Sequence, residues 1–278
     1  MKRTMNLLFL SSLSIFLFSC TRPEQVQVAG STTVLPVVSR AAEQFKNATG
    51  TSVVVNAGGS GVGINQLGEG KIDIAMASRD ITAHERGKFP GVVFTEWVIG
   101  HDAVIPVVSS EIYDAGVTGL SLSQLGAIYS GTITNWKEVG GPDRDILVVD
   151  KEAARGTRHV FMQAVLGDRE AEAPGADLVL GSNNEEQTAI AQSDAAVGML
   201  SHAWLNADVK GLAIITPQGE RIEPVLANIA SGRHPITRSL LLITNGEPEG
   251  EVKAFIDFIL SEQGQNIVEA SGYVGVAK

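Results

Sequence analysis

A glycine-rich turn is the first feature of this sequence that could do chemistry. Residues 58–61 read Gly-Gly-Ser-Gly and begin two residues after the predicted strand 52–55. A glycine-rich turn between a strand and a helix often directs backbone amides at a negative group. Such a turn can hold a dinucleotide, stabilise an acyl oxyanion beside a nucleophilic serine, or bind a free anion.

The first two possibilities fit the turn poorly. In a dinucleotide-binding G-x-G-x-x-G motif, Gly59 and Gly61 match, but Ile64 occupies the third glycine position. A nucleophile elbow around Ser60 needs a glycine where Val62 stands. The histidines at 84, 101, 159, 202 and 234 form no catalytic motif and no pair with metal-ligand spacing. An exported serine hydrolase using Ser60 is the less favoured alternative, and no metal site is expected.

A free anion fits better, because the same chemistry occurs at three predicted turns. Residues 30–33 (Gly-Ser-Thr-Thr), 58–61 and 155–157 (Arg-Gly-Thr) each combine free amides at a helix start with a hydroxyl group. Arg79 and Arg155 lie at comparable strand ends. Ligands of open α/β sheets bind at the carboxyl ends of the strands. We therefore predict a site that surrounds a small oxyanion with donors from several turns.

The elements that would position these turns alternate along the chain. Hydrophobic periodicity predicts strands at 26–29, 52–55, 72–77, 103–108, 146–149, 197–200, 212–216 and 240–244, and helices around 34–45, 64–67, 121–129, 160–165 and 252–260. This alternation predicts an α/β fold with largely parallel sheets.

The N-terminus reads as an export signal. Lys2 and Arg3 precede an apolar run over 7–18, which is too short to span a bilayer. The run ends in Leu-x-Ser-Cys at 17–20, which resembles the lipobox of bacterial lipoproteins. We expect residues 1–19 to be removed as a signal peptide, Cys20 to become the lipidated N-terminus, and residues 20–25 to form a linker.

Composition limits the possible partners. The 278 residues include 31 acidic and 21 basic side chains, and two of the basic ones lie in the predicted signal peptide. Nucleic acid and anionic membrane surfaces are therefore unlikely partners. Cys20 is the only cysteine, so the exported protein must be stable without a disulfide.

Five ordered motifs resemble those of the phosphate-binding proteins of bacterial phosphate ABC importers, from about residue 26 to the C-terminus. They are Gly30-Ser31-Thr32-Thr33-Val34-x-Pro36, Gly58-Gly59-Ser60-Gly61-x-Gly63-Ile64, Ile72-Asp73-Ile74-Ala75-x-Ala77-Ser78-Arg79, Gly131-x-Ile133-Thr134-Asn135-Trp136 and Arg155-Gly156-Thr157-Arg158-x-x-Phe161.

The resemblance implies a two-lobed type II periplasmic-binding-protein fold, in which crossing strands join the lobes and the ligand lies in the cleft between them. Lobe 1 would hold residues 26–103 together with 232–278, which return to it and end in a C-terminal helix, and lobe 2 would hold 104–231. The implied protein is a monomer without catalysis or cofactor, lipid-anchored to the membrane at the periplasmic or cell surface. It would capture inorganic phosphate and deliver it to an ABC transporter permease. The same role for sulfate, molybdate, arsenate or an organophosphate stays open.

Site residues carry over by position. The implied phosphate-binding residues are Ser31, Thr32, Thr33, Ser60, Gly61, Arg79, Arg155, Gly156 and Thr157. Two of them depart from the family pattern. Arg155 replaces a serine, and Arg79 stands where one branch has an aspartate that accepts the proton of bound phosphate. The acceptor would then be Asp80, a hydroxyl group or a backbone carbonyl, and we expect phosphate to bind best while sulfate or arsenate competes measurably.

Overall fold

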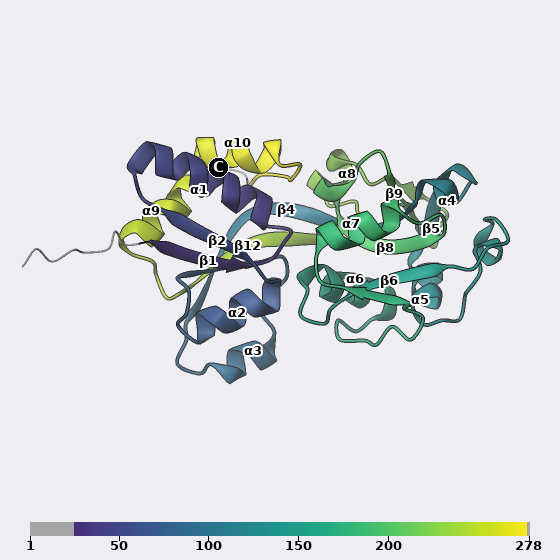
Figure 1. Ribbon diagram of the computed structural model, residues 1–278, viewed down its shortest axis with the longest axis horizontal. Coiled ribbons are helices and arrows are strands. Elements are labelled where there is room, and N and C mark those ends of the chain that lie inside the picture. Colours follow the sequence, from purple (N-terminus) through teal and green to yellow (C-terminus); the bar gives the residue numbers. More distant parts are fainter. Residues whose placement is uncertain (1–24, 277–278) are drawn as a thin grey trace, which may run out of the picture.

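The computed structural model describes residues 25–276, which form two lobes lying side by side and joined by two strands (Figure 1). Lobe 1 contains the first elements of the chain and its last two helices, and lobe 2 contains the middle of the chain. The two-lobed α/β architecture predicted from the sequence is confirmed. The predicted signal peptide and Cys20 lie outside the described residues.

The strands follow one another along the chain as β1 (Val26–Gly30), β2 (Val53–Ala57), β3 (Ile74–Ala77), β4 (Phe94–Ser109), β5 (Gly119–Ser121), β6 (Leu147–Lys151), β7 (Leu178–Leu180), β8 (Ala196–Ser201), β9 (Val209–Gly211), β10 (Ala213–Ile215), β11 (Arg221–Ile222) and β12 (Thr237–Asn245). The α-helices are α1 (Leu35–Thr49), α2 (Ser60–Gly68), α3 (Ala83–Lys88), α4 (Ser110–Asp114), α5 (Leu122–Tyr129), α6 (Gly156–Leu166), α7 (Asn183–Ala191), α8 (Leu226–Ala230), α9 (Gly250–Leu260) and α10 (Glu262–Ala270). Short 3₁₀ turns occur at Trp136–Val139 and His202–Trp204. Within residues 25–276, no helix combines the length and the apolar character needed to cross a bilayer.

One sheet runs through both lobes in the strand order β2-β1-β3-β12-β4-β8-β6-β7, with β9 also paired to β4. A separate small sheet has the order β11-β10-β5. The expectation of largely parallel sheets is only partly correct. β1 is parallel to β2 and β3, and β6 is parallel to β7 and β8, but β12 is antiparallel to both β3 and β4. The chain leaves lobe 1 along β4 and returns along β12, so these two neighbouring strands run in opposite directions.

Strand β4 is the longer of the two connections. It pairs with β12 from Phe94 to Ala103 and with β8 from Val104 to Val108. Its change of partner therefore falls between Ala103 and Val104. The backbone amide of Val104 donates to Ile236 just before β12 begins, which ties the two connections together at this point.

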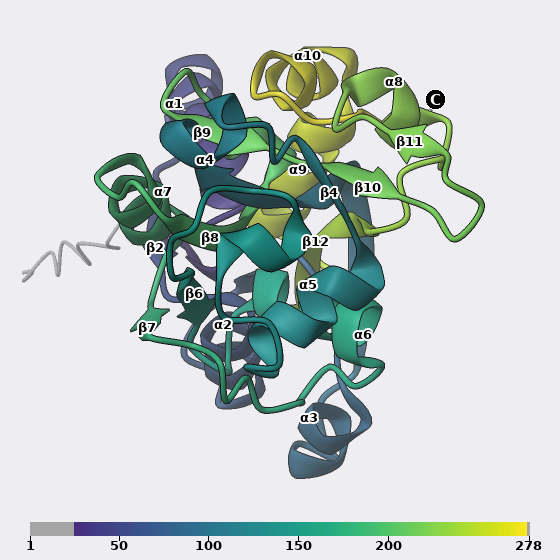
Figure 2. The same ribbon diagram turned by 90° about the vertical axis from the view of Figure 1, so that its right-hand side faces the viewer.

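Each lobe has helices on both faces of its part of the sheet. In lobe 1, α1, α9 and α10 cover one face, where Phe45 and Phe255 pack with ring centroids 5.3 Å apart, and α2 covers the other. In lobe 2, α5 and α6 lie on one face, where Tyr129 meets Phe161 at 5.0 Å, and α7 lies on the other (Figure 2). These cores hold the turns at the strand ends in fixed positions.

The periodicity of the sequence locates half of the ten described α-helices. The apolar positions predicted at 34–45 belong to α1, which has a proline in its first turn and ends at Gly50 in the left-handed conformation. Helix α9 ends at Leu260 as predicted, but the C-terminal segment continues into α10, which Ser261 caps by accepting from the amide of Gly264. Helices α3, α4, α7, α8 and α10 are absent from the predicted set.

Candidate functional site

Hydroxyl groups from four separate turns meet between the lobes. The side chains come from the start of α1, the start of α2, the end of β3 and the start of α6. We call this group the hydroxyl cluster, and all of its members are at most 3% exposed: Ser31, Thr33, Ser60, Ser78 and Thr157.

Short contacts connect the members of the cluster within lobe 1. Ser31 Oγ donates to Ser78 Oγ at 2.9 Å, and the backbone amide of Ser78 donates to Ser60 Oγ at 3.1 Å. The backbone amide of Thr33 donates to Ser31 Oγ at 3.2 Å. The turns after β1 and β3 and the start of α2 therefore present their hydroxyl groups at one point, as predicted for the first two of the glycine-rich turns.

Lobe 2 closes against this cluster with the first turn of α6. Thr157 Oγ1 lies 3.4 Å from Thr33 Oγ1. A Cβ atom at Gly156 would lie 2.4 Å from Ser60 Oγ, a distance that real Cβ atoms do not adopt, so only glycine fits there. The amide of Gly61 donates across the cleft to the carbonyl of Ala154 at 3.0 Å. Gly61, predicted as a ligand donor, thus makes a contact between the lobes in this structure.

Three helices begin at the cluster. The N-terminal turns of α1, α2 and α6 leave backbone amides without partners inside the helix, and each helix end carries a partial positive charge. Helix N-termini combined with hydroxyl donors are suited to an anion. This arrangement compensates locally for the acidic composition of the whole chain.

Arg238 supplies a full positive charge to the same cluster. Its side chain, on β12, is 2% exposed, and Nη1 donates to Thr157 Oγ1 at 3.0 Å while Nη2 donates to Thr33 Oγ1 at 3.2 Å. On the neighbouring strand β4, Asp102 accepts from Nε and Nη2 through Oδ2 at 2.9 and 2.7 Å. Asp102 therefore holds the guanidinium group of Arg238 in place, and the other edge of that guanidinium group faces the hydroxyl groups.

Ser78, Arg238 and Asn183 are absent from the predicted site. Arg238 is the one charged residue in strand β12, and a single charge in a buried strand is the signal that could have identified it. Asn183, 1% exposed at the start of α7, donates from Nδ2 to Thr33 Oγ1 at 3.0 Å. No local motif marks this contact, because α7 lies 150 positions from Thr33 in the sequence.

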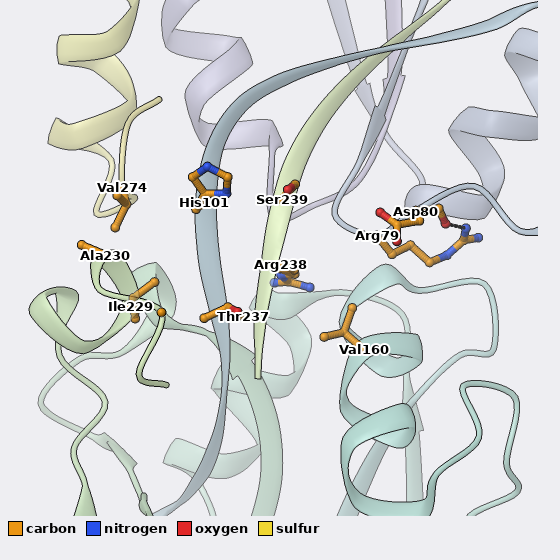
Figure 3. A pocket seen from close by; sticks show the side chains of 11 residues that line it. Arg79, Asp80, His101, Val160, Ile229, Ala230, Thr237, Arg238, Ser239 and Val274 are labelled. Carbon is orange, nitrogen blue, oxygen red and sulfur yellow. Dashed lines mark hydrogen bonds between the residues drawn. The ribbon is translucent and has the colours of Figure 1, made fainter. Parts of the chain in front are cut away.

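Arg79 does not take the position expected for it. Its terminal nitrogens Nη1 and Nη2 donate to Glu85 at 2.9 and 2.7 Å, and Figure 3 shows it well apart from Arg238, beside Asp80. Burial tends to raise the pKa of Glu85, but the hydrogen bonds and charge of Arg79, with further hydrogen bonds from Thr82, outweigh it and hold the pKa below its usual value. In this structure Arg79 is thus paired with a carboxylate of its own lobe, and its expected pairing with an anion stays a prediction.

Asp80 also lies away from the cluster. It is exposed and lines a cavity of about 500 Å³ beside the crossing strands, together with His101 and Ser239 (Figure 3). Arg79 reaches the backbone carbonyl of Asp80 at 2.9 Å. The structure therefore gives no support to Asp80 as the acceptor of a ligand proton.

Thr32 and Arg155 lie just outside the cluster. Both line a depression of about 440 Å³ on the surface between the lobes. Arg155 donates from Nε and Nη2 to Glu152 Oε2 at 2.9 and 2.5 Å. Arg155 is therefore at the rim of the site, paired with a carboxylate, rather than among the hydroxyl groups.

The cluster offers hydrogen-bond donors, its hydroxyl groups and backbone amides, together with the positive charge of Arg238. Ser60 Oγ accepts from the amide of Ser78, and no histidine of the described residues hydrogen-bonds to it. His159 is the histidine that lies in α6, close in the sequence to Thr157. Its ring contacts the carbonyl of Ala153 through Nε2. Residues 25–276 also contain no group of three or more His, Cys, Asp or Glu side chains that could hold a metal ion. The arrangement can bind a small oxyanion, and within residues 25–276 no histidine lies in position to take a proton from Ser60.

Comparison with known proteins agrees with this geometry. The family model described as PBP superfamily domain matches residues 20–263. The phosphate-binding protein PstS of Bacillus subtilis is 33% identical over 252 residues, which cover 90% of this chain and 80% of that protein. PstS of Borreliella burgdorferi is 32% identical and 99% of each chain is covered. A crystal structure of a putative phosphate ABC transporter substrate-binding protein from Clostridium perfringens with bound phosphate has 31% identity and a TM-score of 0.82, covering 91% of this chain and all of that one.

Proposed function

The chain belongs to the PBP superfamily and, within it, to the phosphate-binding PstS proteins, and on that premise we propose that it captures inorganic phosphate outside the cytoplasm and delivers it to an ABC-type importer. The relatives are transport proteins, and the same role without catalysis is proposed here. The observation that carries the proposal is the hydroxyl cluster itself, in which buried hydroxyl groups, three helix N-termini and Arg238 converge between the lobes.

Phosphate would lie between the lobes and accept hydrogen bonds from both. Lobe 1 would contribute the amides and hydroxyl groups at the start of α1 and α2, and lobe 2 the first turn of α6, with Arg238 donating from the crossing strand. The proposed ligand residues are Ser31, Thr32, Thr33, Ser60, Ser78, Gly156, Thr157 and Arg238. In the structure the hydroxyl groups contact one another, so binding exchanges these contacts for contacts to the anion. The lobes must separate to admit phosphate and close again around it.

We propose the lobes as predicted, with residues 26–103 and 232–278 in one and 104–231 in the other, of which residues 277–278 lie outside the described part of the chain. The change of partner strand between Ala103 and Val104 supports the first boundary. Binding would then stabilise the closed arrangement of two bodies connected by β4 and β12, and a permease would recognise that arrangement.

Substitution of Thr157 by alanine tests the contribution of lobe 2. The variant loses one hydroxyl donor to a charged acceptor, so we expect a loss of roughly 1.5–3 kcal/mol, or about tenfold to a hundredfold in phosphate affinity, by titration calorimetry. Thr188→Ala is the matched control, because Thr188 is exposed on α7 and donates only to Asn184 of its own helix. Equal affinities of the two variants would exclude Thr157 from the site.

The proposed anchor is tested at Cys20, which lies outside the described residues. Cys20→Ala is expected to remove lipidation and to shift the protein from the membrane fraction to the soluble fraction, because a lipidated N-terminus holds a protein at the membrane. Phosphate binding is expected to stay unchanged, since the cluster begins at Ser31. Detergent-phase partition is the measurement, and a variant that still enters the detergent phase would contradict the anchor.

The choice of anion is tested by titrating the ligand-stripped protein with phosphate, sulfate, arsenate and molybdate at two pH values. We expect phosphate to bind best and sulfate or arsenate to compete measurably. Tighter binding of sulfate or molybdate would replace phosphate as the assigned ligand. A serine hydrolase would instead turn over chromogenic esters, and we expect no turnover.

A further inference from the structure

A surface depression lies immediately outside the hydroxyl cluster. Its volume is about 440 Å³. Four of the residues that line it are Thr32, Gly58, Arg155 and Ser182, and each is within two positions of a cluster residue or of Asn183. An anion that enters or leaves the cluster from this side must therefore pass these residues.

The side chain of Arg155 crosses from lobe 2 to lobe 1 at this place. A Cβ atom on Gly59 would lie 2.9 Å from both Cδ and Nη1 of Arg155, and one on Gly181 would lie 3.1 Å from Nη2. Two glycines thus leave the room that the side chain occupies, and Gly59 has a φ of +94°, which disfavours any other residue. The side chain is only 16% exposed, although it lies at the rim of the site.

The charges around Arg155 indicate that it covers the site rather than attracting the anion. Glu152, three residues earlier, accepts from both Nε and Nη2. Glu185 lines the same depression and accepts from the amide of Gly181 at 2.8 Å. The guanidinium group is therefore already paired in a rim that carries two carboxylates, whereas Arg238 supplies the charge inside the cluster.

We infer that Arg155 is the cover of the anion site, so that it slows the release of bound phosphate and excludes phosphate esters. This rests on the proposed function. An ester whose organic group points toward the depression would meet the side chain of Arg155, which reaches Gly59 of the other lobe. Inorganic phosphate has no such group and would fit beneath this side chain.

Two variants separate a cover from a charged ligand. Arg155→Ala removes both the bulk and the charge, whereas Arg155→Gln removes the charge and keeps most of the bulk. Radiolabelled phosphate is chased with unlabelled phosphate to measure release, and methyl phosphate and phenyl phosphate are titrated by calorimetry. Arg144→Ala is the control, because it removes an arginine of lobe 2 whose partner, Asp194, lies on the outer surface.

We expect Arg155→Ala to release phosphate about tenfold faster, with association changed much less, and to bind methyl phosphate that the wild type rejects. Arg155→Gln and Arg144→Ala are expected to release phosphate at the wild-type rate and to reject both esters. If the glutamine variant lost as much phosphate affinity as the alanine variant, Arg155 would be a charged ligand and the inference would be wrong. Unchanged release and ester rejection in Arg155→Ala would also overturn it. A wild type that binds no phosphate would instead refute the proposed function.

Discussion

Replacing Arg238 by alanine is expected to reduce phosphate affinity by at least about a thousandfold, on the order of 4 kcal/mol, and to destabilise the fold. The variant loses the guanidinium group that donates to both Thr33 and Thr157. It also leaves the carboxylate of Asp102, whose side chain is fully buried, without its cation and close to the bound anion. Removing one partner of a buried ion pair costs about 3–5 kcal/mol of stability.

The two effects of this substitution can be separated. The double variant Arg238→Met with Asp102→Asn has no buried charge at this position, so we expect it to recover most of the stability and none of the affinity. Unfolding in guanidinium chloride measures the first quantity and titration calorimetry the second. An Arg238→Ala variant that is folded and binds phosphate within about tenfold of the wild type would show that Arg238 is not the cation of the site.

Replacing Lys151 by methionine is expected to cause the largest loss of stability in lobe 2. Lys151 and Glu186 form an ion pair with side chains 1% and 0% exposed. Burial lowers the pKa of Lys151 and raises that of Glu186, in each case against the opposing effect of the partner's charge. Without Lys151 the buried carboxylate is unpaired, so we expect a loss of about 3–5 kcal/mol in the free energy of unfolding.

Two controls define this prediction. Lys151→Met combined with Glu186→Gln keeps an acceptor for the amide of Met199, which Glu186 now binds at 2.7 Å, and is expected to regain most of the stability. Lys137→Met removes a lysine whose partner Asp143 is 73% exposed, and a solvent-exposed pair of this kind contributes little to stability. Denaturant titration measures the free energy of unfolding of Lys151→Met, of the double variant and of Lys137→Met. Equal losses in Lys151→Met and Lys137→Met would mean that the buried pair is not needed.

The buried pair also has a consequence for the site. Lys151 Nζ lies 3.3 Å from the carbonyl of Ser182, directly before Asn183. Asn183 in turn donates to Thr33 of the other lobe. The ion pair of Lys151 and Glu186 therefore supports the start of α7, from which Asn183 reaches the hydroxyl cluster.

The parts of the site that the sequence predicts are the local ones. A strand, a turn with glycine and hydroxyl residues, and a helix form one continuous segment, so Ser31, Ser60 and Thr157 can be placed at helix starts from their neighbours alone. The ordered motifs then place these turns in a known two-lobed fold. This is why the predicted turns supply four of the five members of the hydroxyl cluster, all except Ser78 at the end of β3.

Long side chains and distant partners are not predictable in this way. Arg79 lies at a strand end as expected, but the capping box of α3 brings Glu85 back to Thr82 and within reach of the guanidinium group. Arg155 is likewise bound by Glu152, three residues before it. The sequence thus places both arginines at the correct strand ends. The direction in which each side chain points depends on a carboxylate that the motif does not include.

Arg238 depends on a contact of a different kind. It meets Asp102 across 136 positions because β12 and β4 are paired in register, with these two residues opposite each other. The crossing strands were expected from the resemblance to a family, but strand register and the direction of a buried side chain are tertiary properties. Periodicity within one segment carries no information on them.

The most direct measurement is a crystal structure of the mature protein with phosphate bound. The account predicts phosphate between the lobes, with its oxygens within hydrogen-bonding distance of Arg238, Thr33 and Thr157, and with Arg79 still paired to Glu85. Phosphate bound at Arg79, or in the depression beside Arg155 with the hydroxyl cluster unchanged, would contradict it.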